Sequence, residues 1–283
     1  MSSHVNRPPP MDWAGERGQS WGAHLDPLEA MLTPVNPPLL DALELGQAHR
    51  VADLACGGGG STAALVQAAP PGSVVHGYDI SPSLLELART RVGPPAEFFV
   101  ANLETASEPE EKYERLVSRF GTMFFSDPPA AFRNIARWLK PRGKFAFAVW
   151  GAPAENRWAS VVREAVASVV TVPDNPPDSP GPFRYGEIAP YLELLKSAGF
   201  INVHPQMWRG ALRPAGGVSP EEAASFALSA FSSFAALLEG AGPKAGPAAH
   251  EALRTALSAY VEDGEVALPA AVHLVTGSLA SRA

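Results

Sequence analysis

Four consecutive glycines stand between an acidic residue and a Ser-Thr pair in the segment Asp53-Leu-Ala-Cys-Gly-Gly-Gly-Gly-Ser-Thr62. Glycine lets a backbone turn sharply and approach a ligand closely, and a helix that follows directs its free N–H groups at the same place. A second acid, Asp79, stands about twenty residues further on, where a carboxylate can bind both hydroxyls of a ribose. This spacing predicts a binding site for a ligand that contains a nucleoside.

Two classes of nucleoside cofactor bind to loops of this kind. In a dinucleotide fingerprint, a third glycine inside the helix allows close packing around a pyrophosphate. Thr62 occupies that place here, and Asp53 stands where it would repel a pyrophosphate. Because an acid suits a ligand with an ammonium group better, the loop favours S-adenosylmethionine. An NAD-type oxidoreductase and a non-catalytic S-adenosylmethionine-binding protein remain the alternatives.

Apolar strands alternate with helices along the chain from the strand that leads into this loop. Strands are predicted over residues 51–55, 74–78, 96–101, 114–118, 144–150, 201–208 and 266–276. Helices are predicted over residues 28–45, 61–69, 82–91, 128–139, 158–170, 187–198, 220–238 and 246–261. This alternation predicts a doubly wound, Rossmann-like α/β fold with a mostly parallel, seven-stranded sheet. The helix over 28–45 is expected against the edge of the sheet.

The composition excludes several other classes of protein. The 283 residues carry a net charge of −7 without a Lys/Arg cluster, so nucleic acid is not expected as a partner. The single cysteine, Cys56, can form neither an internal disulfide nor a metal cluster, which fits a reducing cytoplasm and predicts no metal site. No apolar run is long enough to span a bilayer, and residues 1–12 do not resemble a secretory signal. We therefore expect a cytoplasmic protein with no membrane partner; its oligomeric state is left open.

Further motifs follow the glycine loop in a fixed order. They are Gly77-Tyr-Asp-Ile-Ser-Pro82, Ser118-Arg-Phe-Gly-Thr-Met-Phe-Phe125, Leu139-Lys-Pro-Arg-Gly143, Ala198-Gly-Phe200 and Leu268-Pro-Ala-Ala-Val-His-Leu-Val275. Together with Val51–Gly59, this set resembles the class I S-adenosylmethionine-dependent methyltransferases over residues 13–276. Its central part is similar to the ubiquinone/menaquinone C-methylase-like branch of small-molecule methyltransferases. The resemblance also implies that the last strand of the sheet is antiparallel.

The resemblance implies a cofactor site at the ends of the first four strands. In it Asp53 and the backbone of Ala55, Gly57 and Gly59 hold the methionine end, Asp79 the ribose, Ile80, Asn102 and Leu103 the adenine, while Ser118, Arg119 and Phe120 line the cofactor. Two positions depart from the family pattern. Asn102 replaces the usual Asp and must turn its amide oxygen toward the adenine amino group, and Ala55 stands where Gly is common, which tightens the loop.

The rest of the chain is expected to cover the cofactor and shape an acceptor pocket. Residues 1–46 are predicted to form an arm and helix over the cofactor site, 47–218 and 262–283 the core, 219–261 a helical cap inserted in the core, and 171–186 a Pro-rich, lid-like loop. An aromatic ring from the arm, Trp21 or Trp13, would cover the sulfonium. The candidate acceptor-binding residues are Phe124, Trp150, Phe183 and Tyr185, and Tyr185 and His24 are the candidate bases.

The segment Ser126-Asp-Pro-Pro129 resembles a motif of amino-group methyltransferases, but it lies well past Ser118 and lacks the aromatic residue that follows in that motif. A helix N-cap followed by prolines in the first turn explains it fully. The sequence therefore predicts methyl transfer from S-adenosylmethionine to a small molecule, a secondary metabolite, without identifying the acceptor or the atom that is methylated.

Overall fold

A seven-stranded sheet forms the centre of the computed structural model, which describes residues 12–174, 176 and 178–281. Its strand order is β3-β2-β1-β4-β5-β9-β6. The strands are β1 (Arg50–Leu54), β2 (Val74–Asp79), β3 (Glu97–Val100), β4 (Tyr113–Arg119), β5 (Leu139–Trp150), β6 (Phe200–Leu212) and β9 (Leu268–Leu279). Within this sheet β9 runs antiparallel to both of its neighbours, β5 and β6, and the other strand pairs are parallel. The predicted α/β fold is confirmed. Predictions for residues 1–11, the beginning of the expected arm, lie outside the described residues.

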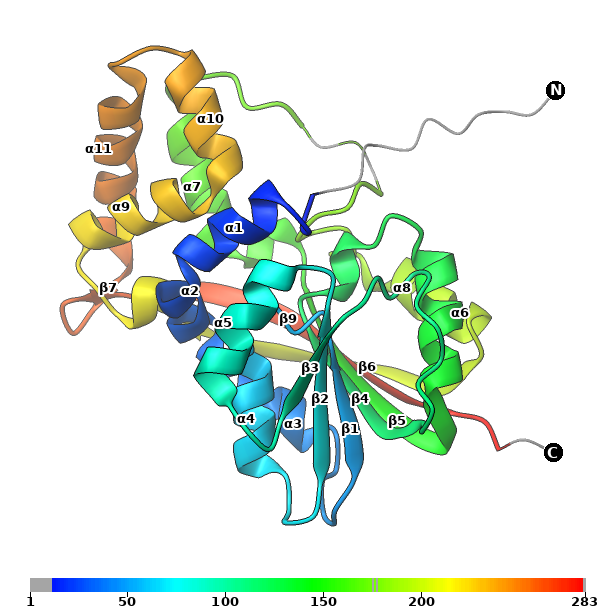
Figure 1. Cartoon of the computed structure of the whole chain (residues 1–283). Coiled ribbons are helices and arrows are strands. Elements are labelled where there is room, and N and C mark those ends of the chain that lie inside the picture. Colours follow the sequence, from blue (N-terminus) through cyan, green and yellow to red (C-terminus); the bar gives the residue numbers. More distant parts are fainter. Residues whose placement is uncertain (1–11, 175, 177, 282–283) are drawn as a thin grey trace, which may run out of the picture.

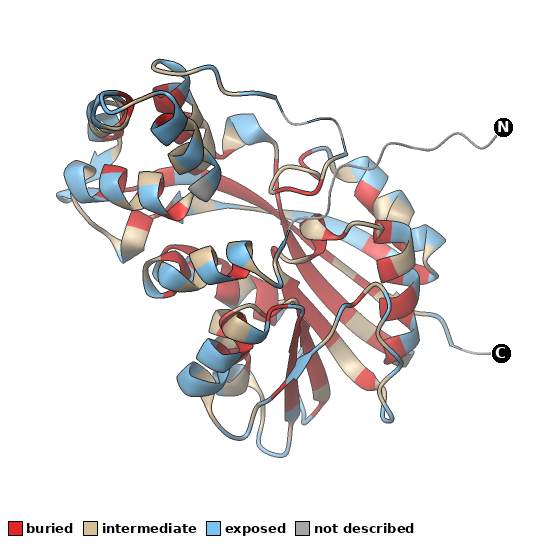
Figure 2. Ribbon diagram, turned by 45° about the horizontal axis from the view of Figure 1, so that its top comes forward, coloured by how far each residue is buried: buried red, intermediate tan, exposed pale blue. Residues whose placement is uncertain are grey.

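Helices cover both faces of the sheet (Figure 1). One face carries α3 (Asn36–Asp41), α4 (Gly60–Ala68) and α5 (Pro82–Val92), and the other carries α6 (Pro128–Trp138) and α8 (Ile188–Ser197). The strands are largely buried between these layers, and the helices have a buried side toward the sheet and an exposed side outward, as Figure 2 shows. In α6, for example, Phe132 and Ile135 are fully buried while Arg133 is exposed. The strands are apolar throughout because helices cover both faces of the sheet.

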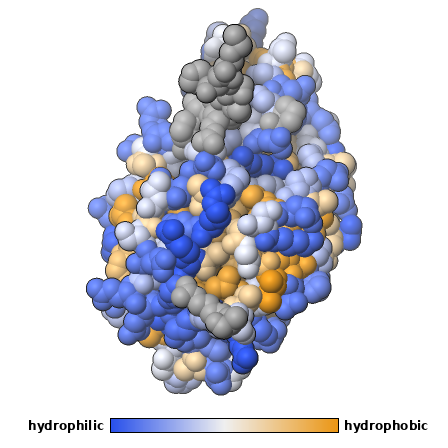
Figure 3. Space-filling model, turned by 90° about the vertical axis from the view of Figure 1, so that its right-hand side faces the viewer, coloured by the Kyte–Doolittle hydropathy of each residue, from blue (hydrophilic) through white to orange (hydrophobic). Residues whose placement is uncertain are grey.

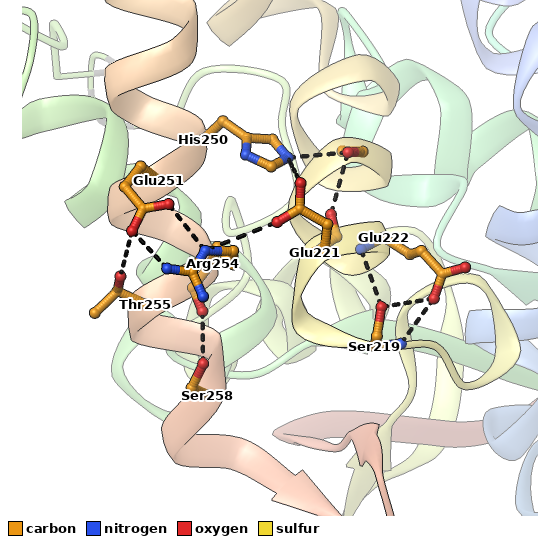
Figure 4. A network of polar contacts seen from close by, with 9 residues as sticks. Ser219, Glu221, Glu222, His250, Glu251, Arg254, Thr255 and Ser258 are labelled. Atoms are coloured by element: carbon orange, nitrogen blue, oxygen red, sulfur yellow. Dashed lines mark hydrogen bonds and ion pairs between the residues drawn. The ribbon is translucent and has the colours of Figure 1, made fainter.

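A helical lobe stands beyond the sheet and is built mainly from the segment between β6 and β9 (Figure 1). It contains α9 (Pro220–Ala230), α10 (Ser232–Gly240) and α11 (Ala245–Leu257), and α11 packs against both α9 and α7 (Arg157–Ala167). Polar contacts join α9 to α11, because Glu221 of α9 lies beside His250 and Arg254 of α11 (Figure 4). Helix α9 itself begins with a capping box between Ser219 and Glu222. The short elements of the chain are η1 (Thr33–Val35), η2 (Thr122–Phe124), η3 (Pro153–Glu155), η4 (Pro214–Gly216), η5 (Ser258–Tyr260), β7 (Val261–Glu262) and β8 (Glu265–Val266).

Two N-terminal helices, α1 (Glu16–Ala23) and α2 (Leu25–Leu32), lie between the helical lobe and α5 (Figure 1). Helix α1 packs on α5 so closely that a Cβ on Gly18 would overlap the hydroxyl of Ser81. Ser81 begins α5 directly after β2, because its hydroxyl accepts a hydrogen bond from the backbone N–H of Leu84. The N-terminal helices are thereby fixed beside the carboxyl ends of the strands.

Two long predicted helices are broken in the structure. The expected helix over 28–45 is divided into α2, η1 and α3, because Pro34, Pro37 and Pro38 start new helical turns that cannot continue the old ones. Its last part packs on α4, β4 and β5 rather than along the sheet edge. The expected helix over 220–238 bends at Phe231, whose φ of −98° and ψ of 78° are not helical. This bend turns the expected helical pair of the cap into three helices.

Strand β6 forms one edge of the sheet. Pro205 within it has no N–H to offer to a further strand, which discourages edge-to-edge pairing. Figure 3 shows the side of the molecule that lies to the right in Figure 1, where apolar side chains gather in the middle and hydrophilic ones surround them. No single helix in the described part of the chain is long and apolar enough to cross a membrane; only the bent pair α9–α10 meets that measure when both helices are counted together.

Candidate cofactor-binding site

The glycine loop joins the end of β1 to the start of α4. Gly57 and Gly59 adopt the left-handed φ values of +55° and +83°, which glycine takes without strain. A Cβ on Gly57 would meet no atom within 4 Å, whereas a Cβ on Gly59 would lie 3.0 Å from the Cβ of Ala88 on α5. Gly57 thus leaves open space for a ligand, and Gly59 allows α5 to pack against the loop. Ala55 also adopts a left-handed φ of +54°, despite its side chain.

Asp79, at the end of β2, is tied to the same loop. One carboxylate oxygen accepts a hydrogen bond of 2.8 Å from the backbone N–H of Gly57, and the other accepts one of 2.9 Å from the N–H of Ser81. Burial raises the pKa of Asp79, although these backbone hydrogen bonds oppose the rise. The acid and the glycine loop therefore form one unit, as their spacing in the sequence predicts.

Asp53 is completely buried at the end of β1. Its Oδ2 accepts hydrogen bonds from the hydroxyls of Ser61, at 2.8 Å, and Thr62, at 2.7 Å, while its Oδ1 has no hydrogen-bond partner. Burial raises the pKa of Asp53 to about 6 against the effect of those two hydroxyls. A buried carboxylate oxygen without a donor is costly, so this atom fits a positively charged ligand group. Thr62 acts here as a partner of Asp53 and not as a substitute for a glycine.

The other two glycines of the run accommodate helix α2. A Cβ on Gly58 would overlap the side chain of Leu25, and a Cβ on Gly60 would overlap the carboxylate of Glu29. Leu25 and Glu29 are one helical turn apart on α2, so the same face of that helix lies against both glycines. Of the four glycines, one thus leaves open space, one accommodates α5, and the other two accommodate the N-terminal helix α2.

The contact between α2 and the loop predicts the effect of one substitution. Gly58→Ala is expected to lower the free energy of unfolding by about 1–3 kcal/mol, because the new methyl group overpacks Leu25. Chemical denaturation measures this loss. The double variant Gly58→Ala/Leu25→Ala should lose less free energy of unfolding than the two single variants lose in total, because the truncated side chain at position 25 makes room for the new methyl group. Strict additivity would contradict the contact.

Arg119, at the end of β4, forms a buried ion pair with Glu29 of α2. A second guanidinium N–H donates a hydrogen bond of 2.8 Å to the side-chain oxygen of Asn36 on α3. The neighbouring Ser118 donates to the carbonyl of Leu54, at 2.7 Å, and so ties β4 to β1. Glu29 and Asn36 were not among the predicted site residues; no local motif marks them, because they meet Arg119 only in the folded chain.

The residues predicted to contact adenine lie on the loops after β2 and β3. Ile80 is 39% exposed, so its side chain is accessible to the adenine ring that is predicted to pack on it. Asn102 is exposed, and its Oδ1 accepts a hydrogen bond from the backbone N–H of Glu104. The Leu103 side chain belongs to the hydrophobic core, which leaves the backbone of this residue for the expected contact. These three roles stay predictions.

Aromatic rings gather beside the strand ends. The ring of Phe120 stacks on Trp150 with a centroid distance of 3.9 Å, and Trp150 contacts Trp158 at 4.7 Å. Trp158 in turn contacts Phe183, at 5.8 Å, and Phe231, at 5.7 Å. This aromatic row joins two predicted acceptor-binding residues, Trp150 and Phe183, to Phe120 and to the helical lobe.

A second aromatic group comes from the N-terminal segment. Trp13 packs edge-on against Trp21, at 5.9 Å, and against Phe124, at 5.0 Å. The indole N–H of Trp13 is buried without a hydrogen-bond partner. The N-terminal segment therefore contacts η2, which follows the fourth strand, and brings Trp21 and Phe124 into one cluster.

The two candidate bases lie in different surroundings. His24 stands at the junction of α1 and α2. Tyr185 is buried against Tyr191, with ring centroids 4.2 Å apart, and its hydroxyl has no hydrogen-bond partner. Burial raises the pKa of Tyr185 to about 12, so its hydroxyl is protonated at neutral pH. No hydrogen bond or ring contact joins His24 to Tyr185 in the described part of the chain.

The segment after Ser126 is the predicted helix start. Asp127 accepts a hydrogen bond of 3.1 Å from the backbone N–H of Ala130, and prolines occupy the first turn of α6. Among the described residues, no group of His, Cys, Asp and Glu side chains is placed to hold a metal ion. The site is therefore built from the glycine loop, two buried acids, a buried ion pair and aromatic rings.

Comparison with known proteins agrees with this arrangement. Residues 51–143 match the family model of a methyltransferase domain. An uncharacterised protein of Mycobacterium tuberculosis is 28% identical over 125 residues, which are 43% of this chain and 44% of that protein. Phosphoethanolamine N-methyltransferase 1 of Triticum aestivum is 31% identical over 58% of this chain and 30% of its own length. Aklanonic acid methyltransferase of a Streptomyces strain is 27% identical over 41% of this chain and 54% of its own length. The chain thus spans less than two thirds of each of these relatives.

Solved structures share the fold. A protein of Anabaena variabilis, described as a methyltransferase of an antibiotic biosynthesis pathway, has a TM-score of 0.63 at 16% identity, with 87% of this chain and 97% of that one covered. Phosphoethanolamine N-methyltransferase 2 of Haemonchus contortus, solved with phosphomonomethylethanolamine and S-adenosylhomocysteine, has a TM-score of 0.52 at 18% identity over 88% of this chain and 53% of that one.

The sheet and its covering helices define a doubly wound α/β fold, in which ligands bind beyond the carboxyl ends of the strands. Within this fold, residues 51–143 match the methyltransferase domain family, in agreement with the resemblance of the sequence to class I methyltransferases. Structures of the Haemonchus contortus enzyme, which shares this fold, were solved with S-adenosylmethionine and with S-adenosylhomocysteine, the cofactor and product that the sequence of this chain predicts. The named relatives act on phosphoethanolamine and on aklanonic acid, so the C-methylase-like branch stays a resemblance of the sequence.

Proposed function

We propose that this protein transfers a methyl group from S-adenosylmethionine to a small-molecule acceptor, a secondary metabolite, in the cytoplasm. The observation that carries the proposal is the unit formed by the glycine loop and its two acids. Gly57 leaves open space, Asp79 holds the loop and lies where a ribose would bind, and Asp53 has an unpartnered oxygen that suits an ammonium group. S-adenosylmethionine supplies a methyl group on a positively charged sulfur, which a nucleophile can accept directly.

The aromatic row around Trp150 and the cluster around Trp13 are proposed to form the walls of the acceptor pocket. Both follow strand ends, where ligands of open α/β sheets bind. Rings that exclude water and align the acceptor supply much of what methyl transfer requires of a protein. The protonated hydroxyl of Tyr185 suits hydrogen-bond donation to the acceptor better than proton removal. His24 remains the proposed base where the acceptor must lose a proton.

The experiment that tests the function has a binding arm and a transfer arm. Calorimetry with S-adenosylhomocysteine and with NAD distinguishes a methyltransferase from an oxidoreductase, because only the former needs the thioether nucleoside. A panel of planar phenols, amines and acids with methyl-labelled S-adenosylmethionine then identifies the acceptor class. Binding of NAD in place of S-adenosylhomocysteine would refute the proposal. Tight S-adenosylhomocysteine binding without transfer to any acceptor would favour a non-catalytic binding protein.

Asp79 gives a prediction for the same assay. Asp79→Asn is expected to weaken S-adenosylhomocysteine binding roughly tenfold or more, because an amide cannot accept both the Gly57 N–H and a pair of ribose hydroxyls. Calorimetry measures the loss. Asp41→Asn, an exposed position on α3, is the matched control and should bind normally. Unchanged affinity in Asp79→Asn would refute the ribose assignment.

A further inference from the structure

Buried polar atoms without a hydrogen-bond partner are concentrated in two segments of the chain. Within the part of the chain that the structure describes, five side chains have such an atom: Trp13, Asp53, Trp138, Ser179 and Tyr185. Three of them lie in residues 12–24 and 178–186, which we call the covering segments. The indole N–H and the two hydroxyls can all donate a hydrogen bond. A buried donor without an acceptor is costly, so these atoms suit a ligand that offers acceptors.

Both covering segments are held on η2 and the residue that follows it. The ring of Trp13 packs against Phe124 with a centroid distance of 5.0 Å. From the other segment, the backbone N–H of Gly181 donates a hydrogen bond of 3.2 Å to the carbonyl of Met123. Arg184 donates one to the carbonyl of the residue after Phe124. The covering segments therefore meet on three consecutive residues, directly after the carboxyl end of β4, where ligands of open α/β sheets bind.

The covering segments also carry two arginines without an acid partner. The Arg17 guanidinium lies 5.3 Å from the centroid of the Trp13 ring, and the Arg184 guanidinium lies 5.8 Å from that of Tyr185. Both arginines are half-buried, and neither forms an ion pair within residues 12–174, 176 and 178–281. Burial lowers the pKa of Arg17, and no acid beside it opposes that effect. A partly buried cation without a counter-ion suits an anionic ligand group.

The acids of the covering segments do not supply that counter-ion. Asp12, Glu16 and Asp178 are all exposed. The carboxylate of Asp12 accepts a hydrogen bond of 2.9 Å from the backbone N–H of Gly15, just before α1. The charge of Asp178 raises the pKa of Tyr185 further and so helps to keep its hydroxyl a donor. Donors and cations therefore predominate where the covering segments meet.

We propose that the methyl acceptor is an aromatic molecule with an acidic group, a carboxylate or a phosphate ester, which Arg17 binds and to which Trp13 and Tyr185 donate hydrogen bonds. This assignment rests on the proposed function and names the class of its acceptor. A planar guanidinium suits such a group because it can donate to two oxygens at once. Arg184 is a positioning residue, since it fastens the segment that carries Tyr185 to the residue after η2.

Three matched probes test the assignment on the protein loaded with S-adenosylhomocysteine. The probes are 2-naphthoate, 2-naphthyl phosphate and the uncharged 2-naphthamide, which share one ring system. In calorimetry, at least one of the two acids should bind roughly tenfold or more tightly than the amide, because charge-assisted hydrogen bonds stabilise only the acids. The acid that binds more tightly identifies the acidic group.

Arg17→Gln removes the cation that is proposed to bind the acidic group. This variant is expected to weaken binding of the tighter acid roughly tenfold or more and to leave the amide within about threefold. Arg133→Gln is the matched control, because Arg133 is an exposed arginine on α6 and the substitution changes the net charge equally. It should leave the affinities for all three probes unchanged.

Tyr185→Phe separates recognition from folding. The Tyr185 hydroxyl has no partner in the ligand-free protein, so its removal should leave the free energy of unfolding unchanged or raise it. The same variant should weaken the tighter acid about threefold or more, because one hydrogen bond to the acid is lost. A loss of stability in chemical denaturation would show that the hydroxyl has an internal partner and would remove Tyr185 from the proposed site.

The outcomes are distinct. A preference for an acid over the amide that disappears in Arg17→Gln supports the assignment. Equal affinities for the acids and the amide, no binding of either acid, or a preference that persists in Arg17→Gln would overturn it. Failure of the unchanged protein to bind S-adenosylhomocysteine would instead reject the proposed function itself.

Discussion

Asp53→Asn is expected to weaken S-adenosylhomocysteine binding roughly tenfold or more and, at about pH 8, to make the ligand-free protein more stable. Both effects follow from the buried carboxylate at the end of β1. Its Oδ1 has no hydrogen-bond partner in the ligand-free protein, so its charge costs stability. In the complex the same charge is expected to meet the ligand ammonium.

The pKa of Asp53 fixes the direction and the pH window of the stability effect. Burial raises that pKa from 3.8 to about 6. The folded protein holds the proton more tightly than the unfolded chain, so its stability falls as pH rises from about 4 to 6. A rise of about two units corresponds to about 3 kcal/mol of lost stability above that window. Asparagine removes the charge, but its NH2 group would be buried without an acceptor, so we expect a net gain of about 1–2 kcal/mol.

Denaturation curves between about pH 4 and 8 measure this gain, and calorimetry measures the loss of binding. Asp41→Asn, an exposed carboxylate on α3, serves as the control and should change neither quantity. A destabilised Asp53→Asn protein at the alkaline end would show that the carboxylate has an internal partner. Unchanged affinity would remove Asp53 from the cofactor site.

The unchanged protein should show the corresponding pH dependence of binding. Its affinity for S-adenosylhomocysteine is expected to decrease as pH falls below about 6, because protonated Asp53 cannot pair with an ammonium group. Calorimetry across this range measures the change. Affinity that is flat through the same range would show that Asp53 does not bind the ligand in its charged form.

Gly57→Ala is expected to abolish cofactor binding while the protein stays folded. Its Cβ would project into the open space that no protein atom approaches within 4 Å, where the cofactor is expected. The left-handed φ of +55° adds a strain of about 1–2 kcal/mol, which a domain of this size tolerates. Binding should therefore fall far more than stability.

Gly199→Ala is the matched control for this substitution. Gly199 also has a positive φ, of +99°, and also has no atom within 4 Å of its Cβ position, but it lies between α8 and β6. Both variants should lose similar stability in denaturation experiments, and only Gly57→Ala should lose affinity for S-adenosylhomocysteine. Equal affinity in the two variants would show that the space over Gly57 is not the cofactor site.

Local patterns of the sequence predicted the framework correctly. The period of apolar residues gave the strands and most helices, and Asp127 with its two prolines gave the start of α6. The spacing between the glycine loop and Asp79 correctly predicted that the acid lies beside the loop, because both follow buried strands that pair in parallel. The effect of proline on a helix is also local, so the breaks between α2 and α3 could have been predicted from Pro34 and Pro37.

Other features depended on contacts between distant residues. Phe231 interrupts a helical pattern that continues on both sides of it, and packing of Phe231 against Trp158 accompanies the bend. Glu29 and Arg119 are 90 positions apart, and no periodicity or motif relates them. Their pairing exists only because α2 lies across the glycine loop.

The run of four glycines illustrates the division. The sequence by itself determined that the backbone turns there, since this needs only glycine and its neighbours, and from the same residues it predicted a nucleoside-containing ligand. Tertiary structure alone decided what each glycine accommodates: open space at Gly57, α5 at Gly59, and α2 at Gly58 and Gly60. The physical reason is that a glycine allows another group to approach the backbone closely but does not identify that group. Only the folded chain shows which segment lies there.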